Sequence, residues 1–170
     1  KTVTLSFWVN SSLTGQNSFS FTNSGARSYV GTYTINSANT WEQKTITIPG
    51  DTTGTWVGAT NGIGIVLGWS LGTGSSQNTT AGTWTAGNYN GATGTTSVVG
   101  TNGATFYITG VQLEVGSQAT NFEFRPYGME LALCQRYCLY YTGNTTPIAA
   151  MGFHGSNNDG WASFYTPVPM

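Results

Sequence analysis

Apolar and polar residues alternate in several short stretches of this sequence, and clusters of turn residues separate the stretches. The alternation is clear over residues 3–9 and 28–35, and clearest over residues 62–71. A period of two places every second side chain on one face, which is the pattern of a half-buried β-strand. Many short strands separated by turns favour a β-sandwich or barrel. We expect one core-facing row to consist of Ile63, Ile65, Leu67, Trp69 and Leu71.

The longest continuous pattern covers residues 104–137 and begins with a strand whose parity changes. Phe106 and Ile108 share one parity, whereas Val111, Leu113 and Val115 share the other. One extra residue in a strand shifts parity in this way, and glycine suits the backbone of a bulge. We therefore predict a β-bulge at Thr109–Gly110. In the strand predicted over residues 3–9, Trp8 lies on the face opposite the core-facing residues. We expect it to be half-exposed or to contact a neighbouring subunit.

A short helix is predicted after Pro126. Arg125 precedes the proline and is biased away from helical backbone, whereas the apolar spacing beyond Gly128 is typical of a helix. Strands are expected again over 135–142, 147–153 and 160–166. The domain prediction is a sandwich over 1–126, a helical connector over 127–138 and the start of an incomplete C-terminal β-region over 139–170.

The run GVQLEVGSQATNFEFRPYGMELALCQRY resembles a segment of structural proteins from tailed bacteriophages, especially tail-fibre and related virion-surface proteins. The earlier run SYVGTYTINSANTWEQKTITIPGDTTGTW is similar to the sandwich of the same family. The resemblance covers most of residues 1–138, but Cys138 stands where the family usually has tyrosine. It implies a carbohydrate-binding-module-like sandwich on a virion surface and a homotrimer. Together with the strand pattern, it favours jelly-roll-like connectivity, with one short helix leading into a second small β-region.

Charge is scarce in this chain. Only 6% of residues are charged, against roughly 25% in ordinary soluble domains. The 6 Trp, 9 Tyr and 8 Phe nevertheless supply a core. A net charge of −1 without a basic cluster argues against nucleic-acid binding, and no apolar run reaches membrane-spanning length. The chain begins and ends in strand-like patterns, so we expect it to be a segment of a longer protein.

Residues 72–103 are rich in Gly, Thr, Ser and Asn. Short strands are predicted near 83–86 and 97–99. A segment of this length without regular structure is uncommon and is usually functional.

No pattern for catalysis stands out. His154 is the single histidine and lies in a Gly/Asn-rich stretch, so we interpret it as a polar surface residue. Paired carboxylates would serve a polysaccharide-cleaving tailspike, but nothing places Glu114 and Glu123 across a cleft, and Glu123 is expected to pair with Arg125 or Arg136. We expect a non-enzyme without a cofactor.

Cys134 and Cys138 are expected to be reduced and largely buried. Two cysteines without a histidine cluster are poor evidence for zinc. No acidic cluster suits calcium, so no metal is predicted.

The candidate glycan-binding residues are loop aromatics. Trp56, Trp84 and Tyr89 lie among Thr, Asn and Gly, and Arg27 and Tyr29 would add a polar edge. Such rings stack on the C–H faces of sugars. The other interpretation, which the enrichment of aromatics in interfaces favours, is that they cap the sandwich or fill a subunit contact.

These observations lead us to expect a structural tail-fibre or surface-appendage subunit of a phage virion that attaches to host glycans. It would assemble in the host cytoplasm with copies of itself and other virion proteins, without inserting into a membrane. The alternatives are a carbohydrate-binding module of a secreted bacterial protein and a capsid decoration protein without receptor binding.

Overall fold

The computed structural model describes residues 1–57, 62–136, 151–154 and 160–163. The chain divides into two compact units, Lys1–Phe122 and Glu123–Met170. The first unit contains the sandwich. Within the described ranges, no helix has the length and apolarity needed to cross a bilayer.

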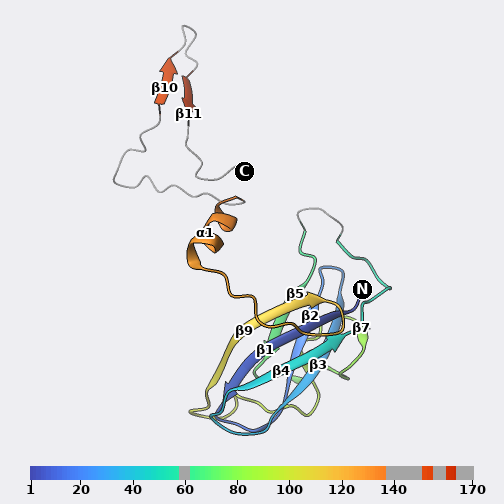
Figure 1. Ribbon diagram of the computed structural model, residues 1–170. Coiled ribbons are helices and arrows are strands. Elements are labelled where there is room, and N and C mark those ends of the chain that lie inside the picture. The colour runs from blue at the N-terminus through green and yellow to red at the C-terminus, as the bar shows by residue number, and fades with distance from the viewer. Residues whose placement is uncertain (58–61, 137–150, 155–159, 164–170) are drawn as a thin grey trace. The chain divides into compact units, whose positions relative to one another are not determined.

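Two antiparallel sheets form the sandwich (Figure 1). Sheet A has the order β4-β1-β9, formed by Glu42–Ile48, Val3–Ser11 and Phe106–Val115. Sheet B has the order β5-β2-β3-β7, formed by Val66–Ser70, Gly15–Thr22, Arg27–Ile35 and Trp84–Ala86. The chain passes between the sheets after β1, β3, β4 and β7. The predicted all-β sandwich with one short helix is confirmed.

The core lies between the sheets. Its fully buried residues from sheet A include Leu5, Phe7 and Val9, which alternate along β1 as the sequence predicts. The Phe7 ring packs edge-on against Tyr33 at 5.1 Å and against Trp69 at 5.5 Å. The Phe19 ring occupies the space above Gly31, where a Cβ atom would overlap it.

The predicted bulge is present in β9. Ser6 pairs with Gln112 and Trp8 with Thr109, so β9 has one more residue than β1 across this interval. Gly110 has a φ of 58°, a left-handed conformation that glycine adopts readily. Because of the extra residue, Leu113 lies on the same side of sheet A as its register partner, core-facing Leu5. Leu113 is nevertheless 42% exposed, because it lies at the edge of the sheet.

The row predicted over 62–71 is only partly correct. The strand β5 covers Val66–Ser70, and Leu67 and Trp69 pack against the core. Ile63 and Ile65 precede the strand and are 61% and 43% exposed. The strand begins only at Val66, although the alternation starts earlier, because β2, its pairing partner, ends at Thr22 opposite Val66.

The segment after β5 forms a layer on the outer face of sheet B. It contains the 3-10 helix η1 (Ser75–Gln77) and the short parallel strands β6 (Asn78–Thr79) and β8 (Gly91–Ala92). Ala92 donates its N–H to Ser18 Oγ at 3.2 Å, and Gly82 donates to the Val30 carbonyl at 2.8 Å. Short serine side chains let this backbone lie close to the sheet.

Of the two strands predicted in that segment, one is confirmed and one is wrong. The strand β7 matches the prediction near 83–86. Residues 97–99 form a loop instead, because Val98 and Val99 both donate to the Leu71 carbonyl, at 2.8 and 3.0 Å. Two donors converging on one carbonyl are incompatible with a strand ladder.

At the edge strand β4, two charged residues lie on the core-facing side. Glu42 and Lys44 occupy register positions opposite Val9 and Phe7, and their side chains form a 2.6 Å ion pair. Glu42 also accepts hydrogen bonds from the Asn36 and Ser37 N–H groups. The Lys44 contact, followed by that with Ser37, lowers the pKa of Glu42 to about 2. Inward charges of this kind discourage pairing with another strand.

In the second unit, helix α1 covers Tyr127–Gln135 and the strands β10 (Met151–His154) and β11 (Gly160–Ser163) pair antiparallel. Arg125 pairs with Glu123 at 3.0 Å, as predicted, and also with Glu130 at 3.4 Å. The prediction of a buried Cys134 is wrong, because the helix is exposed on the side that carries this thiol. Cys138 and most of the strand expected over 135–142 lie outside the described residues.

Candidate functional site

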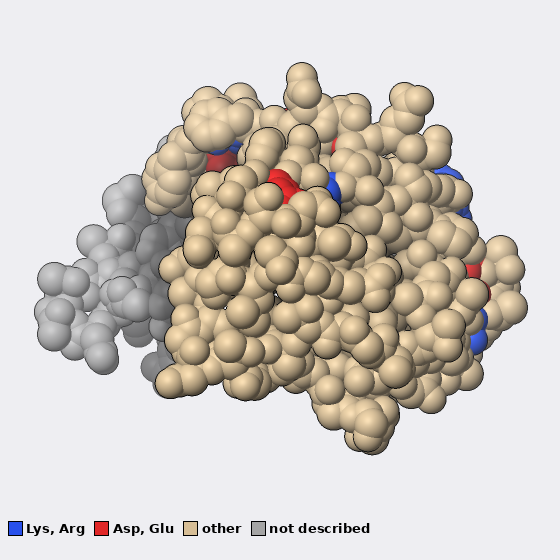
Figure 2. Space-filling model, turned by 90° about the horizontal axis from the view of Figure 1, so that it is seen from below, with Lys and Arg blue, Asp and Glu red and all other residues tan. Residues whose placement is uncertain are grey.

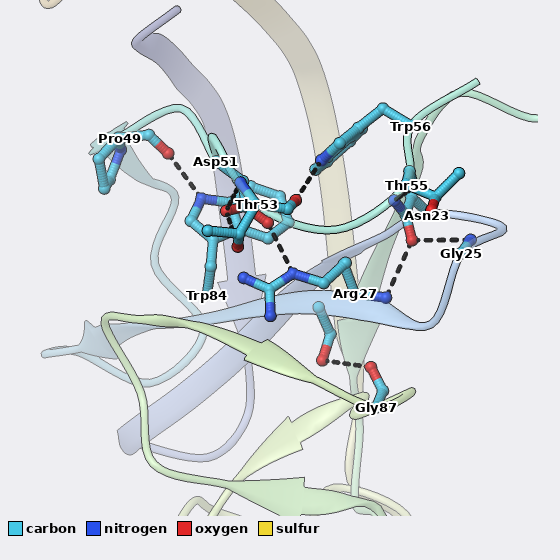
Figure 3. Close-up of polar contacts among 11 residues, drawn as sticks. Asn23, Gly25, Arg27, Pro49, Asp51, Thr53, Thr55, Trp56, Trp84 and Gly87 are labelled. Carbon is cyan, nitrogen blue, oxygen red and sulfur yellow. Dashed lines mark hydrogen bonds and ion pairs between the residues drawn. The ribbon is translucent and has the colours of Figure 1, made fainter. Parts of the chain in front are cut away.

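Two of the predicted tryptophans meet at one end of the sandwich. Trp84 lies on β7, and Trp56 lies in the loop that follows β4. Their rings pack edge to face at 5.3 Å with an interplanar angle of 79°. The Trp84 indole N–H donates to the Pro49 carbonyl at 2.7 Å, and that of Trp56 donates to the Thr53 carbonyl at 3.0 Å. Both rings are therefore fixed by the same loop (Figure 3).

A small pocket opens beside these rings, where β1 begins and β4 ends. Its volume is about 190 Å³, below the roughly 300–1,000 Å³ of pockets for drug-sized ligands. Besides Trp56 and Trp84 it is lined by Lys1, Val3, Pro49, Gly50, Asp51 and Ile65. The lining is mainly apolar, with polar groups at Lys1 and Asp51. Such a space suits one small, partly apolar unit with hydroxyl groups.

An ion pair supports the loop behind the pocket. Arg27 Nε donates to Asp51 Oδ2 at 2.7 Å, and the two side chains are 15% and 5% exposed. The other carboxylate oxygen accepts from the Thr53 N–H at 3.0 Å and its hydroxyl at 2.8 Å. These contacts, with Arg27 first, hold the pKa of Asp51 well below its usual range. Asp51 therefore orders the loop as an ionised carboxylate.

Asn23 connects the β2–β3 turn to the same loop. Its Oδ1 accepts from the N–H groups of Gly25 and Arg27, both at 2.9 Å, and its Nδ2 donates to the Thr55 carbonyl at 2.9 Å. Gly25 lies directly against that carbonyl, where a Cβ would collide with it. The turn thus holds Arg27 next to Asp51 and, through the Thr55 carbonyl, helps to fix the position of the neighbouring Trp56 (Figure 3).

Tyr29 and Arg27 do not form the expected polar edge. Tyr29 is only 6% exposed and packs beneath Trp84 at 5.6 Å, because the two residues are register partners in sheet B. Burial raises the pKa of its hydroxyl. The Arg27 guanidinium forms an ion pair with Asp51. Both residues position the pocket, and neither is among its lining residues.

Tyr89 lies elsewhere. Its N–H donates to Ser28 Oγ at 3.2 Å, and its ring lies beside Gly87. Ser28 alternates with core-facing Tyr29 along β3, so Tyr89 contacts the outer face of sheet B. Trp84, the register partner of core-facing Tyr29, and Tyr89 therefore lie on opposite faces of sheet B, and Tyr89 is not among the residues that line the pocket.

Sequence reasoning did not find the loop residues that build the pocket. Residues 49–51 carry no pattern that indicates a site, although an Asp two residues before Thr53 is a common side-chain-to-backbone turn signal. Lys1, Val3 and Ile65 carry no local signal for a site. They meet the tryptophans only through the packing of the two sheets.

Other acidic groups have structural partners. Both Glu114 oxygens accept from Thr120, from its N–H at 2.9 Å and its hydroxyl at 2.5 Å, and Glu123 pairs with Arg125. Across the described part of the chain, no group of three or more His, Cys, Asp or Glu residues could hold a metal ion. Comparison with protein-family models, curated proteins and solved structures gave no match.

Proposed function

We propose that this protein is a non-enzymatic, virion-surface subunit of a tailed bacteriophage, and that its sandwich binds host glycans through the Trp56–Trp84 pocket. The phage assignment derives from the sequence resemblance described above. The binding assignment derives from the pocket, where two indole rings are held in fixed positions by main-chain acceptors. Fixed rings lose little conformational freedom on binding, which favours affinity for a weakly interacting ligand.

The chemistry of the lining fits a single sugar residue. Trp56, Trp84 and Ile65 offer apolar surface for the C–H groups of a pyranose ring. Asp51 has a carboxylate with about four acceptor positions, three of which are used by Arg27 and Thr53. One position remains for a sugar hydroxyl, and the Lys1 ammonium is a donor. The volume accommodates the end of a glycan chain better than its middle.

A glycan array probed with the purified full chain tests this function, with mass measurement of the same sample. We expect a homotrimer that binds a defined terminal sugar, with binding lost in Trp56→Ala and retained in the matched control Tyr127→Ala, which removes an 80% exposed ring from the second unit. Trp56 is the better probe because Trp84 also packs on core residue Tyr29.

The other outcomes separate the alternatives. A monomer that binds sugar would favour a module of a secreted bacterial protein. A stable oligomer that binds no glycan would favour a capsid decoration or purely structural role, with the tryptophans in a subunit contact. Glycan binding that persists in Trp56→Ala would rule out the pocket as the site.

A further inference from the structure

The outer face of sheet A is covered over one half and open over the other. Along β1 the outward side chains are Thr4, Ser6 and Trp8, and their exposed fractions are 0%, 4% and 40%. Residues 116–120, which follow β9, cover the first half. The change in exposure occurs within one strand, so it reflects what lies on the face and not the position of the strand in the sheet.

In the covered half, polar side chains bind the covering segment. Thr4 Oγ1 donates to the Gly116 carbonyl at 2.8 Å, and Thr47 Oγ1 donates to the Ser117 carbonyl at 3.2 Å. Glu114 binds Thr120, which lowers the pKa of Glu114. This half therefore satisfies its polar groups within the protein.

The open half carries large aromatic rings instead. Trp8, Tyr107 and Phe122 are 40%, 55% and 52% exposed. Gly110 lies between the rings of Trp8 and Phe122. A Cβ atom at this position would be 3.3 Å from Trp8 Cδ1 and 3.9 Å from Phe122 Cδ2. Tyr107 is the register partner of Asn10, so it lies diagonally across from Trp8 on the same face.

A fourth ring extends the row to the opposite edge of the sheet. Trp41 lies one residue before β4, next to Glu42, the register partner of Val9, and continued alternation would place it on the outward side with Gln43. It is 46% exposed. Aromatic residues thus occur beside all three strands of sheet A. We call Trp8, Trp41, Tyr107 and Phe122 the platform.

The side chains between the rings are neutral and polar. Asn10, Gln43 and Thr109 occupy outward register positions next to the platform. The charged residues of β4, Glu42 and Lys44, lie at core-facing positions and bind each other. On the face drawn in Figure 2, charged side chains are few, and acidic groups lie close to basic ones. The platform therefore offers stacking and hydrogen bonding without a net electrostatic preference.

We infer that the platform is a second binding surface, for an extended neutral polysaccharide that crosses the strands of sheet A. Rings spread over neighbouring strands can stack on successive sugars, and the intervening amides and hydroxyl can bind their hydroxyl groups. An acidic polymer would need cations, which these register positions lack. A second copy of this chain is the other occupant that an aromatic face could take, since interface cores are enriched in aromatic residues, and the test below distinguishes it.

Affinity electrophoresis of the full chain in gels containing dextran, mannan or hydroxyethyl cellulose tests the inference. We expect retardation by at least one of these polymers and none by dextran sulfate. Trp41→Ala and Tyr107→Ala should each weaken retention about tenfold, the effect typical of a central aromatic contact. Both rings are about half exposed, so the variants are expected to fold. Tyr127→Ala, which removes an 80% exposed ring outside both proposed sites, is the control and should be retained as wild type.

Three results would overturn the inference: a wild-type protein retarded by none of the neutral polymers, retention unchanged in both platform variants, or a change from oligomer to monomer in those variants with unchanged retention. The last result would identify the platform as a subunit contact. The glycan array with Trp56→Ala reports on the pocket, and gel retention with Trp41→Ala and Tyr107→Ala reports on the platform, so failure of the proposed pocket function remains distinguishable from failure of the platform.

Discussion

The pocket and the platform both present aromatic rings, but they hold them in different ways. In the pocket each indole N–H is bonded to a loop carbonyl, and the mostly buried Arg27–Asp51 pair fixes that loop. On the platform, Gly110 provides a gap between Trp8 and Phe122, and the sheet itself sets the spacing. A site built on a loop therefore depends on polar contacts behind it, whereas a site built on a sheet depends on strand register.

The largest expected difference between the two regions concerns the ion pair. Arg27→Met removes the guanidinium and leaves a mostly buried carboxylate without its main partner, which should reduce the free energy of unfolding by about 3 kcal/mol. The matched variant near the platform, Gln43→Met, changes an outward side chain and should alter stability by less than about 0.5 kcal/mol. Chemical denaturation measures both. Similar losses in the two variants would contradict the comparison.

Truncating one tryptophan in each region should give a smaller contrast. Trp84→Ala removes a half-buried ring from Tyr29 and Trp56, and we expect a loss of about 2 kcal/mol, below the range for fully buried rings. Trp8→Ala should lose about 1 kcal/mol because its ring is 40% exposed. Denaturant midpoints at constant m-value provide the test. A larger loss for Trp8→Ala would show that the platform also has a core role.

Acid should weaken the fold through carboxylates that differ in location. The ordinary pKa values are 3.8 for Asp51 and 4.5 for Glu42, and both pKa values are lowered in the folded protein. Their stabilisation is therefore fully present above about pH 5 and declines as the pH falls toward the folded values.

Unfolding measured between pH 5 and 2 should show a shallower pH dependence in Asp51→Asn and in Glu42→Gln than in wild type. Near-ultraviolet circular dichroism should change only in Asp51→Asn, because that carboxylate orders the loop of Trp56 and the acceptor of Trp84. A wild-type pH dependence in both variants would refute these assignments.

The smallest expected effect lies in the turn that leads to Arg27. Ala26 has a φ of 54°, a left-handed conformation that is unfavourable for a residue with Cβ. Ala26→Gly should raise stability by about 0.5 kcal/mol, since relief of strain exceeds the entropy cost of glycine. Asn39→Gly, at a φ of 56°, should change little because Asn tolerates this conformation. Thermal unfolding of the pair decides the point, and equal shifts would argue against strain at Ala26.

Much of the sandwich follows from the sequence because its core strands alternate strictly. The alternation in β1 and the bulge at Gly110 were both predictable, since side-chain period and glycine geometry are local properties. The exposure of Ile63 and the loop at Val98 were not. Each depends on where a partner strand ends or which carbonyl is nearby, and neither is encoded in adjacent residues.

The candidate site was predictable only in part. Trp56 and Trp84 are recognisable as aromatics in polar surroundings, and they do meet. Tyr29 and Tyr89 have the same local signature, but one lies in the core and the other on the outer face of sheet B. The parity of β3, where Ser28 faces outward and Tyr29 inward, decides between them. That assignment requires knowing the pairing with β7.

The contact between Gly31 and Phe19 has a consequence for how this sequence can change over time. The Phe19 ring fills the space that a side chain at position 31 would need. Any enlargement at position 31 therefore requires a smaller residue at position 19, and the intermediate with both large residues would be overpacked. We expect the two positions to co-vary among descendants of this chain, with the reduction at position 19 arising first.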